Sequence, residues 1–355
     1  MIDASLSPND AAPQHGPRPL PLFLEMLRSE TGDAPDRRAK ALAGLAAYQR
    51  ADRGAARALP AALQCRGRVT LRDYGGHGRP VVFVPSLINP PFILDLAEDR
   101  SLLRWLAGEG FRPLLVDWGR PTPADRDLDI TDHVEQLLLP LLATLDEPPV
   151  LVGYCLGGTM ALAAATAMPV AGLGLLAAPW HFGGFGIGAR REIASLWAGA
   201  KPACETMGLV PMEVLQSGFW KLDPARTITK YESYAGLDPD SAAARTFVTL
   251  EDWANAGAPL TYAAGAQLFD FFEQDMTGRG AWHVAGRIVD PAALPCPTVD
   301  FVSRTDRIVP AVSAARLPDT RLLGAGHVGM IVGGRAREQL WEPLAGWLSA
   351  LPAPR

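Results

Sequence analysis

Short apolar runs alternate with amphipathic stretches through the first half of this chain. The apolar runs are typical of strands buried on both faces of a sheet, and they are RPVVFV (79–84), RPLLVDWG (112–119), PPVLVGY (148–154) and AGLGLLAAP (171–179). The stretches between them have helical spacing, and they are 99–110, 129–145 and 157–168. Strands that alternate with helices of this length predict βαβ crossovers. We therefore expect an α/β protein with a mostly parallel sheet and helices on both faces.

The alternation stops after Pro179 and resumes with CPTVDFVS (296–303) and DTRLLGAG (319–326). The sequence between them has helical spacing and is rich in aromatic residues, which indicates a helical cap inserted into the sheet domain. The expected organisation has four parts, which are an N-terminal tail and helical extension (1–60), a first part of the core (61–179), the cap (180–290) and a second part of the core (291–355).

The N-terminal part carries a weaker pattern. Residues 1–18 are rich in Pro, Ala and polar residues without periodicity, so we expect a loose tail. Residues 35–51 place small apolar residues on one helical face, with Asp33 as a possible N-cap, and a strand is expected near RVTLRDY (68–74).

Composition excludes several classes of protein. The net charge of −5 offers no broad basic surface, so no nucleic-acid partner is expected. The four cysteines form no CxxC pair, which argues against a zinc site and a disulfide framework and favours a reducing cytoplasm. No secretory signal and no apolar run of the roughly 20 residues that a membrane span needs are visible. No cofactor and no metal are expected.

Cys155 lies in GYCLGG (153–158), between a predicted strand and a predicted helix. This is the pattern of a nucleophile elbow, in which a strained central residue needs small neighbours such as Gly153, Gly157 and Gly158. The positive end of the following helix favours a thiolate. The backbone amide of Leu156 is a candidate oxyanion donor. The alternative is that Cys155 is a small buried apolar residue.

A nucleophilic cysteine needs a base, and the base needs an orienting group. Asp306 follows the strand predicted at 296–303, and His327 follows the strand predicted at 319–326. Because the carboxyl ends of parallel strands meet at one edge of a sheet, both side chains are expected near Cys155. Nucleophile, acid and histidine then occur in the order of the α/β-hydrolase fold, with a cap. His181 also follows a strand and is a candidate pocket residue or, as a rival to His327, the base.

Backbone amides of the loop PSLINPP (85–91) are candidates for the second oxyanion donor. We expect the amide of Leu87 in this role, with Ile88 as the alternative. Asp117 and Trp118 end the next strand, where a pocket wall and a structural turn are both open interpretations.

Several further blocks of sequence resemble the poly(3-hydroxyalkanoate) synthases, in particular the short catalytic subunits of the two-subunit kind. The blocks are YQR (48–50), LINPPFILDL (87–96), VDWGRP (116–121), GYCLGGTMA (153–161), LLAAPWHF (175–182), VPMEVLQSGFWKLDP (210–224), GRIVD (286–290), DRIVP (306–310) and GHVGMIVG (326–333). Dienelactone hydrolases share a similar elbow but lack the other blocks and a cap. The chain departs from the synthases where Arg307 replaces a common histidine and His181 a common aspartate.

The resemblance implies an acyltransferase that polymerises (R)-3-hydroxyacyl-CoA with release of CoA, through a Cys155, Asp306 and His327 triad and a thioester-linked acyl-enzyme. It implies acyl-CoA as substrate, a cytoplasmic or granule-associated location, contact with a polymer granule surface, and a companion subunit or homodimer. A thioesterase or esterase with the same triad, and a non-catalytic granule-binding subunit, are the alternatives. Five tryptophans between 180 and 290 fit an apolar or granule-facing surface, or the core of the cap itself.

Overall fold

The computed structural model describes residues 15–53 and 58–352, and most of the tail predicted over 1–18 lies outside this range. The chain divides into two compact units. The helical unit consists of residues 1–57 and 219–256, and the sheet unit of residues 58–218 and 257–355. The four-part organisation predicted from the sequence stays a prediction. The compact units divide the predicted cap, because its middle third groups with the N-terminal helices.

An eight-stranded sheet forms the centre of the sheet unit, in the order β1-β2-β6-β3-β7-β8-β13-β14. β1 and β2 pair antiparallel, as do β2 and β6, and the pairs from β6 to β14 are parallel. The strands are β1 (Ala62–Arg66), β2 (Val69–Asp73), β3 (Pro80–Val84), β6 (Arg112–Asp117), β7 (Val150–Tyr154), β8 (Gly172–Leu176), β13 (Thr298–Ser303) and β14 (Thr320–Leu323). The predicted strands all form, and the parallel strands from β6 to β14 bring their carboxyl ends to one edge of the sheet.

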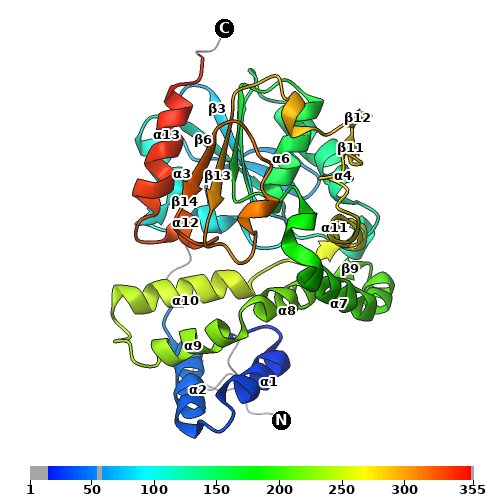
Figure 1. Ribbon diagram of the computed structural model, residues 1–355. Helices are drawn as coiled ribbons and strands as arrows, with labels where there is room; N and C mark the ends of the chain where they lie inside the picture. The colour runs from blue at the N-terminus through cyan, green and yellow to red at the C-terminus, as the bar shows by residue number, and fades with distance from the viewer. Residues whose placement is uncertain (1–14, 54–57, 353–355) are drawn as a thin grey trace, which may run out of the picture. The chain divides into compact units, whose positions relative to one another are not determined.

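Helices cover both faces of this sheet, as the sequence predicts (Figure 1). α3 (Leu102–Gly108) and α13 (Glu342–Ser349) lie on one face, and α6 (Leu156–Ala167) lies on the other (Figure 1). The segment predicted as one helix over 129–145 begins as α4 (Ile130–Asp132), continues as a π-helical stretch, η4 (His133–Leu138), and ends as α5 (Leu139–Leu142). The remaining elements near the sheet are η2 (Pro91–Leu94), β4 (Asp95–Ala97), β5 (Arg100–Ser101), η3 (Pro123–Asp125), η6 (Pro291–Ala293), η7 (Ala311–Ser313), α12 (Gly329–Val332) and η8 (Arg337–Trp341).

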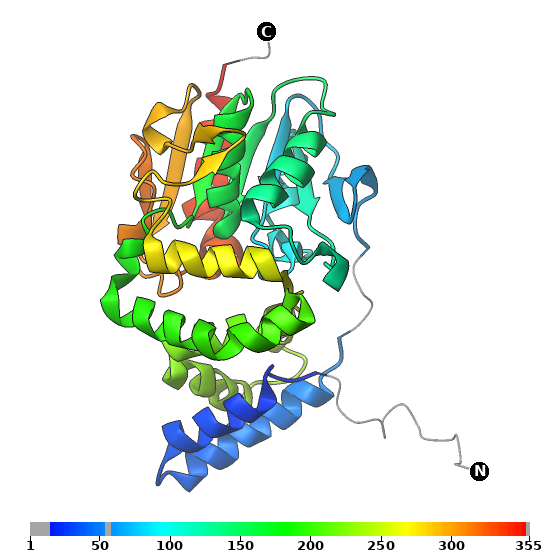
Figure 2. The same cartoon turned by 90° about the vertical axis from the view of Figure 1, so that its right-hand side faces the viewer.

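Two long helices of the predicted cap belong to the sheet unit. α7 (Gly186–Met207) and α11 (Tyr262–Gln274) lie side by side, and the rings of Trp197 and Phe269 stack at 4.4 Å between them (Figure 2). The other elements of this region are η5 (Phe182–Phe185), β9 (Leu209–Val210), α8 (Met212–Leu222), β10 (Leu260–Thr261), β11 (His283–Val284) and β12 (Arg287–Ile288).

The helical unit is built from α1 (Leu20–Thr31), α2 (Pro35–Arg50), the end of α8, α9 (Pro224–Tyr234) and α10 (Ala242–Asn255). Its core holds side chains from all five elements, including Phe23, Tyr48 and Trp220. The prediction of Asp33 as N-cap of α2 is wrong, because the N-cap residue is Ala34, whose side chain makes no capping hydrogen bond. Pro35 at the first helical position supplies the start signal instead, because its missing N–H needs no partner there.

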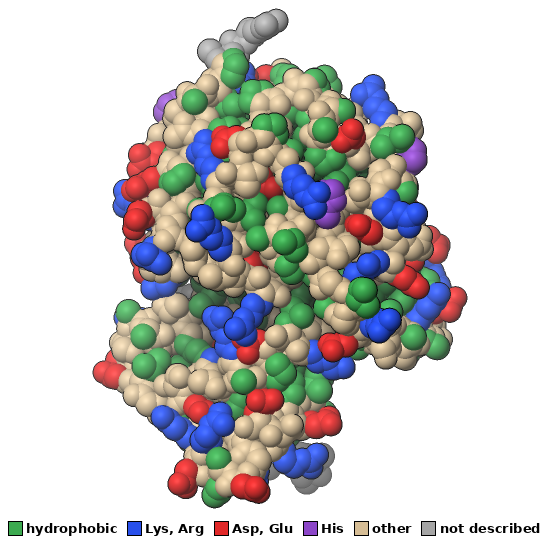
Figure 3. All heavy atoms as spheres, in the orientation of Figure 1, with side chains coloured by type: hydrophobic (Ala, Val, Ile, Leu, Met, Phe, Trp, Pro, Cys, Tyr) green, Lys and Arg blue, Asp and Glu red, His purple; other side chains and the backbone are tan. Residues whose placement is uncertain are grey.

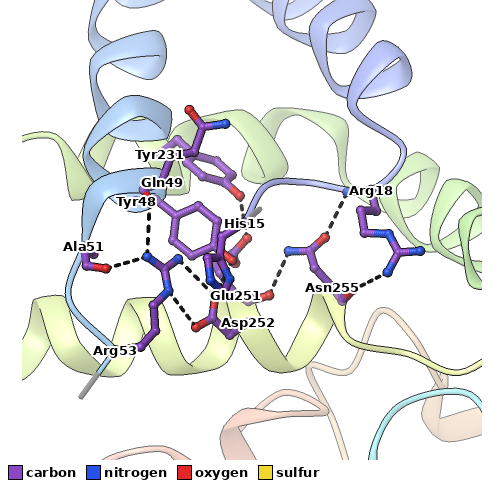
Figure 4. Close-up of polar contacts among 10 residues, drawn as sticks. All are labelled: His15, Arg18, Tyr48, Gln49, Ala51, Arg53, Tyr231, Glu251, Asp252 and Asn255. Atoms are coloured by element: carbon purple, nitrogen blue, oxygen red, sulfur yellow. Dashed lines mark hydrogen bonds and ion pairs between the residues drawn. The ribbon is translucent and has the colours of Figure 1, made fainter. Parts of the chain in front are cut away.

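Polar contacts along α10 join the two chain segments of the helical unit (Figure 4). The hydroxyl of Tyr48 donates to Asp252 at 2.6 Å, and the guanidinium of Arg53 donates to both carboxylate oxygens of Asp252. One turn further on, the backbone N–H of Arg18 donates to the side-chain oxygen of Asn255 at 3.0 Å. Charge-assisted, forked bonds of this kind are among the stronger ones in proteins. Two segments distant in sequence are therefore held in one register.

The five tryptophans between 180 and 290 are all buried, with at most 8% of each side chain exposed. Trp180, Trp197 and Trp282 lie in the sheet unit, and Trp220 and Trp253 lie in the helical unit. The structure supports the core interpretation and contradicts a granule-facing surface made by these tryptophans. On the face seen in Figure 3, acidic and basic side chains are interspersed.

Candidate active site

Cys155 lies at the sharp turn between β7 and α6. Its backbone has φ 55° and ψ −132°, a conformation that a residue with a side chain rarely adopts. The backbone N–H of Cys155 donates to the carbonyl of Leu176 at 3.0 Å, and its own carbonyl accepts from the N–H of Gly158 at 2.8 Å. These two bonds, one to the neighbouring strand and one to the first turn of the helix, stabilise the strained turn.

Three glycines allow the turn to pack this closely. A methyl group on Gly153 would lie 2.3 Å from the Cα of Gly158, and one on Gly158 would lie 2.3 Å from the Cβ of Ala178. A methyl group on Gly157 would lie 2.1 Å from the carbonyl oxygen of Val84, at the end of β3. The glycine requirement inferred from the sequence therefore has a steric cause at each position.

Gly158→Ala is expected to lower the free energy of unfolding by about 2 kcal/mol, because the added methyl group overpacks a rigid contact with Ala178. Thermal and urea unfolding measure the change. Gly346→Ala is the matched control, because Gly346 lies within α13 with no atom near the added methyl group. Helix propensity predicts that this control gains up to about 1 kcal/mol. Equal stability of Gly158→Ala and wild type would contradict the steric argument.

Asp306 and His327 lie at the carboxyl ends of β13 and β14 and are hydrogen-bonded to each other. The distance from His327 Nδ1 to Asp306 Oδ2 is 2.6 Å, and both residues are buried. The other oxygen of Asp306 accepts the backbone N–H groups of Ile308 at 2.7 Å and Val309 at 2.9 Å. Asp306 is thus fixed by two backbone donors and can orient one tautomer of His327, in which Nδ1 carries a proton.

The imidazole of His327 is also hydrogen-bonded to the side chain of Cys155. Burial by itself lowers the pKa of His327, but the charge of Cys155, the hydrogen bonds to Asp306 and Cys155, and the charge of Asp306 outweigh it. The pKa rises from its usual 6.5 to about 10. The structure therefore brings the three residues singled out in the sequence into one connected set, and favours the imidazolium form of His327.

Two backbone amides near Cys155 are candidates for the oxyanion site. Leu156 is the first residue of α6, and the first N–H groups of a helix have no partner within it. In the loop after β3, the N–H of Ile88 donates to the hydroxyl of Ser86 at 3.2 Å, which favours Leu87 over Ile88 as the second donor. The indole N–H of Trp118 donates to the carbonyl of Pro85 at 2.9 Å and holds this loop. Of the two interpretations left open by the sequence, this bond supports a structural role for Trp118.

Asp117 stabilises the turn after β6, because its carboxylate accepts hydrogen bonds from Arg72 at 2.9 Å and from the backbone N–H of Gly119 at 3.1 Å. His181 is the N-cap residue of the short helix η5, and its backbone N–H donates to the carbonyl of Ser313 at 2.9 Å. Burial and the charge of Arg316 lower the pKa of His181, against the charge of Asp275. The pairing with Asp306 belongs to His327, so the structure favours His327 over His181 as the base.

Two features of the site were missed in the sequence. The ring of Tyr154 stacks on the imidazole of His327, with centroids 5.0 Å apart, and its hydroxyl donates to the carbonyl of His327. The hydroxyl of Ser86 holds the backbone of the loop after β3. The position of Tyr154 directly before Cys155 could have indicated that Tyr154 lies near the site, at the end of the strand that carries the nucleophile.

Residues 81–338 match the alpha/beta hydrolase family. The chain belongs to this family, and the fold class predicted from the sequence is confirmed. Among solved structures, the monoacylglycerol lipase of Paleococcus ferrophilus is similar at a TM-score of 0.50, with 16% identity over 79% of this chain and 98% of the lipase. That likeness concerns the fold alone.

Within this family, the chain is similar to the poly(3-hydroxyalkanoate) polymerase subunits, as its sequence blocks indicate. It is 29% identical to the poly(3-hydroxyalkanoate) polymerase subunit PhaC of Haloferax mediterranei, over 76% of this chain and 58% of that relative. It is also 29% identical to the subunit of the same name from Synechocystis, over 76% of this chain and 77% of that relative. The chain thus spans less than two thirds of the length of the haloarchaeal relative. No helix among the described residues has both the length and the apolar character to cross a bilayer.

Proposed function

We propose that this protein is an acyltransferase that polymerises (R)-3-hydroxyacyl-CoA and releases CoA, with Cys155 as nucleophile, His327 as general acid and base, and Asp306 as its orienting group. One observation carries the proposal. The imidazole of His327 connects the buried carboxylate of Asp306 to the thiol at the strained turn of Cys155. The names of the curated relatives support the choice of product.

In the first step the thiolate of Cys155 attacks the thioester carbonyl of the acyl-CoA. A bond between the acyl carbon and the sulfur of Cys155 forms, the bond to the sulfur of CoA breaks, and the imidazolium of His327 gives its proton to the departing CoA thiolate. One thioester replaces another, so the acyl group stays activated. In this proposed step the backbone amides of Leu156 and Leu87 stabilise the tetrahedral oxyanion.

In the second step the 3-hydroxyl of a further acyl unit attacks the acyl-enzyme. Neutral His327 takes the hydroxyl proton, an ester bond forms, and the bond to the sulfur of Cys155 breaks, which restores the thiolate and imidazolium pair. Water would compete for the same thioester and give a free acid. The burial of Asp306 and His327, each 8% exposed, supports a site that limits this competition.

The product distinguishes a polymerase from a thioesterase with the same site. Purified protein incubated with 3-hydroxybutyryl-CoA is expected to release CoA in step with formation of an insoluble polyester, measured by thiol titration and by chromatography of the methanolysed product. Cys155→Ala serves as the blank. Release of CoA with only free 3-hydroxybutyrate, with or without added cell extract, would assign the chain to the thioesterases instead.

Location and partners follow from the same proposal. The relatives are named polymerase subunits, which supports a companion subunit for this chain. A cytoplasmic enzyme on the surface of a polymer granule fits an insoluble product that grows from a soluble substrate. Nothing in the proposal requires a metal or a cofactor, because the reacting groups are a thiol, an imidazole and a carboxylate.

A further inference from the structure

Tyr154 contacts His327 in two ways from the position next to Cys155. Its ring stacks on the imidazole with centroids 5.0 Å apart and planes inclined by 27°. Its hydroxyl donates to the backbone carbonyl of His327 at 3.3 Å. Tyr154 is only 3% exposed, and burial is the first cause that raises the pKa of its phenol well above 10, so the hydroxyl remains a donor.

Hydrogen bonds to three carbonyls hold the backbone of the loop that carries His327. The hydroxyls of Ser303 and Thr305 donate to Ala325 and Gly324, and the N–H of Met330 donates to Gly326. A methyl group on Gly324 would meet no atom within 4 Å, and one on Gly326 would meet only the carbonyl of Thr305 at 3.9 Å. Asp306 holds one edge of the imidazole at Nδ1. Contacts in the plane of the ring restrict its tilt least, and the stacked ring of Tyr154 restricts that tilt.

We infer that Tyr154 is a positioning residue, which sets the approach of the His327 imidazole to the Cys155 thiol through one stacked ring and one hydrogen bond. This inference rests on the proposed roles of Cys155 and His327. Because Tyr154 and Cys155 are adjacent in the chain, Tyr154 sets the position of His327 relative to the backbone that carries the nucleophile. The face of an aromatic ring also attracts a cation, so the stack favours the imidazolium over the neutral imidazole.

Tyr154→Phe and Tyr154→Leu separate the two contacts. Phenylalanine keeps the stack and removes one hydrogen bond, so kcat for CoA release is expected to fall about 5-fold. Leucine removes both contacts, and kcat is expected to fall about 100-fold while KM stays within about 2-fold, because misplacement affects the reacting geometry more than binding. The pKa of His327, followed by NMR of histidine-labelled protein, is expected to stay near 10 in the Phe variant and to fall in the Leu variant.

Tyr262→Leu is the matched control, because Tyr262 packs its ring on Trp197 in the sheet unit. It removes an aromatic ring without an expected change in kcat or in the titration of His327. Equal kcat and equal His327 titration in Tyr154→Leu and Tyr262→Leu, at matched losses of thermal stability, would overturn the inference. The titration and the rate of Cys155 alkylation by iodoacetamide need no acyl-CoA, so they test Tyr154 even if the wild type forms no polymer.

Discussion

Cys155→Ala is expected to reduce the release of CoA from 3-hydroxybutyryl-CoA by at least about 10⁴-fold, since no other group takes over covalent attack. Cys155→Ser is expected to retain more activity than Cys155→Ala but to lose polymer formation. Serine would hold the acyl group as an oxygen ester, which is less activated toward the next 3-hydroxyl. Serine would also remove the charge of Cys155, the largest of the causes that raise the pKa of His327.

Initial rates of thiol release and analysis of the product measure these effects. Cys65→Ala is the control, because Cys65 lies exposed on β1 and its substitution leaves the site intact. Both Cys155 variants are expected to keep the unfolding temperature of the wild type within a few degrees, which separates lost chemistry from lost folding. A Cys155→Ala protein with more than a tenth of wild-type activity would refute Cys155 as the nucleophile.

The parts of the fold that the sequence predicts are those with strong local patterns. β3 and β7 are buried on both faces and read as continuous apolar runs, so their pattern alone identifies them. β1 is exposed along its whole length and carries no such run, so it was missed. The pairing of residues 15–53 with residues 219–256 rests on long-range contacts such as Tyr48 with Asp252. No local pattern encodes contacts of that kind.

The candidate site divides in the same way. Cys155, Asp306 and His327 could be proposed because each follows a predictable strand, and parallel strands bring such residues to one edge. Backbone donors leave no trace in side-chain identity, and the choice between Leu87 and Ile88 needed the hydrogen bond from Ile88 to Ser86. The stack of Tyr154 on His327 depends on the course of the loop after β14, which glycines leave unspecified in the sequence.

In the proposed reaction His327 acts first as an acid and then as a base. The charge of Cys155 can account for this change in the protonation state of His327. In the resting protein the pKa of His327 is about 10, so the imidazolium persists at neutral pH and can protonate the departing CoA. When Cys155 becomes a thioester its charge is lost, and with it the largest of the causes that raise this pKa. Burial then favours the neutral imidazole, which is the form that can accept the proton of the 3-hydroxyl.

Alkylation of Cys155 with iodoacetamide, which mimics the neutral acyl-enzyme, is therefore expected to lower the pKa of His327 by about one to three pH units. NMR titration of histidine-labelled protein measures the change. His133 is an internal reference, because burial lowers its pKa to about 4 and its ring contacts Arg68 and Asp129. A pKa of His327 unchanged by alkylation would contradict the coupling, and Asp306→Asn, which removes the other raising charge, is expected to lower it before alkylation as well.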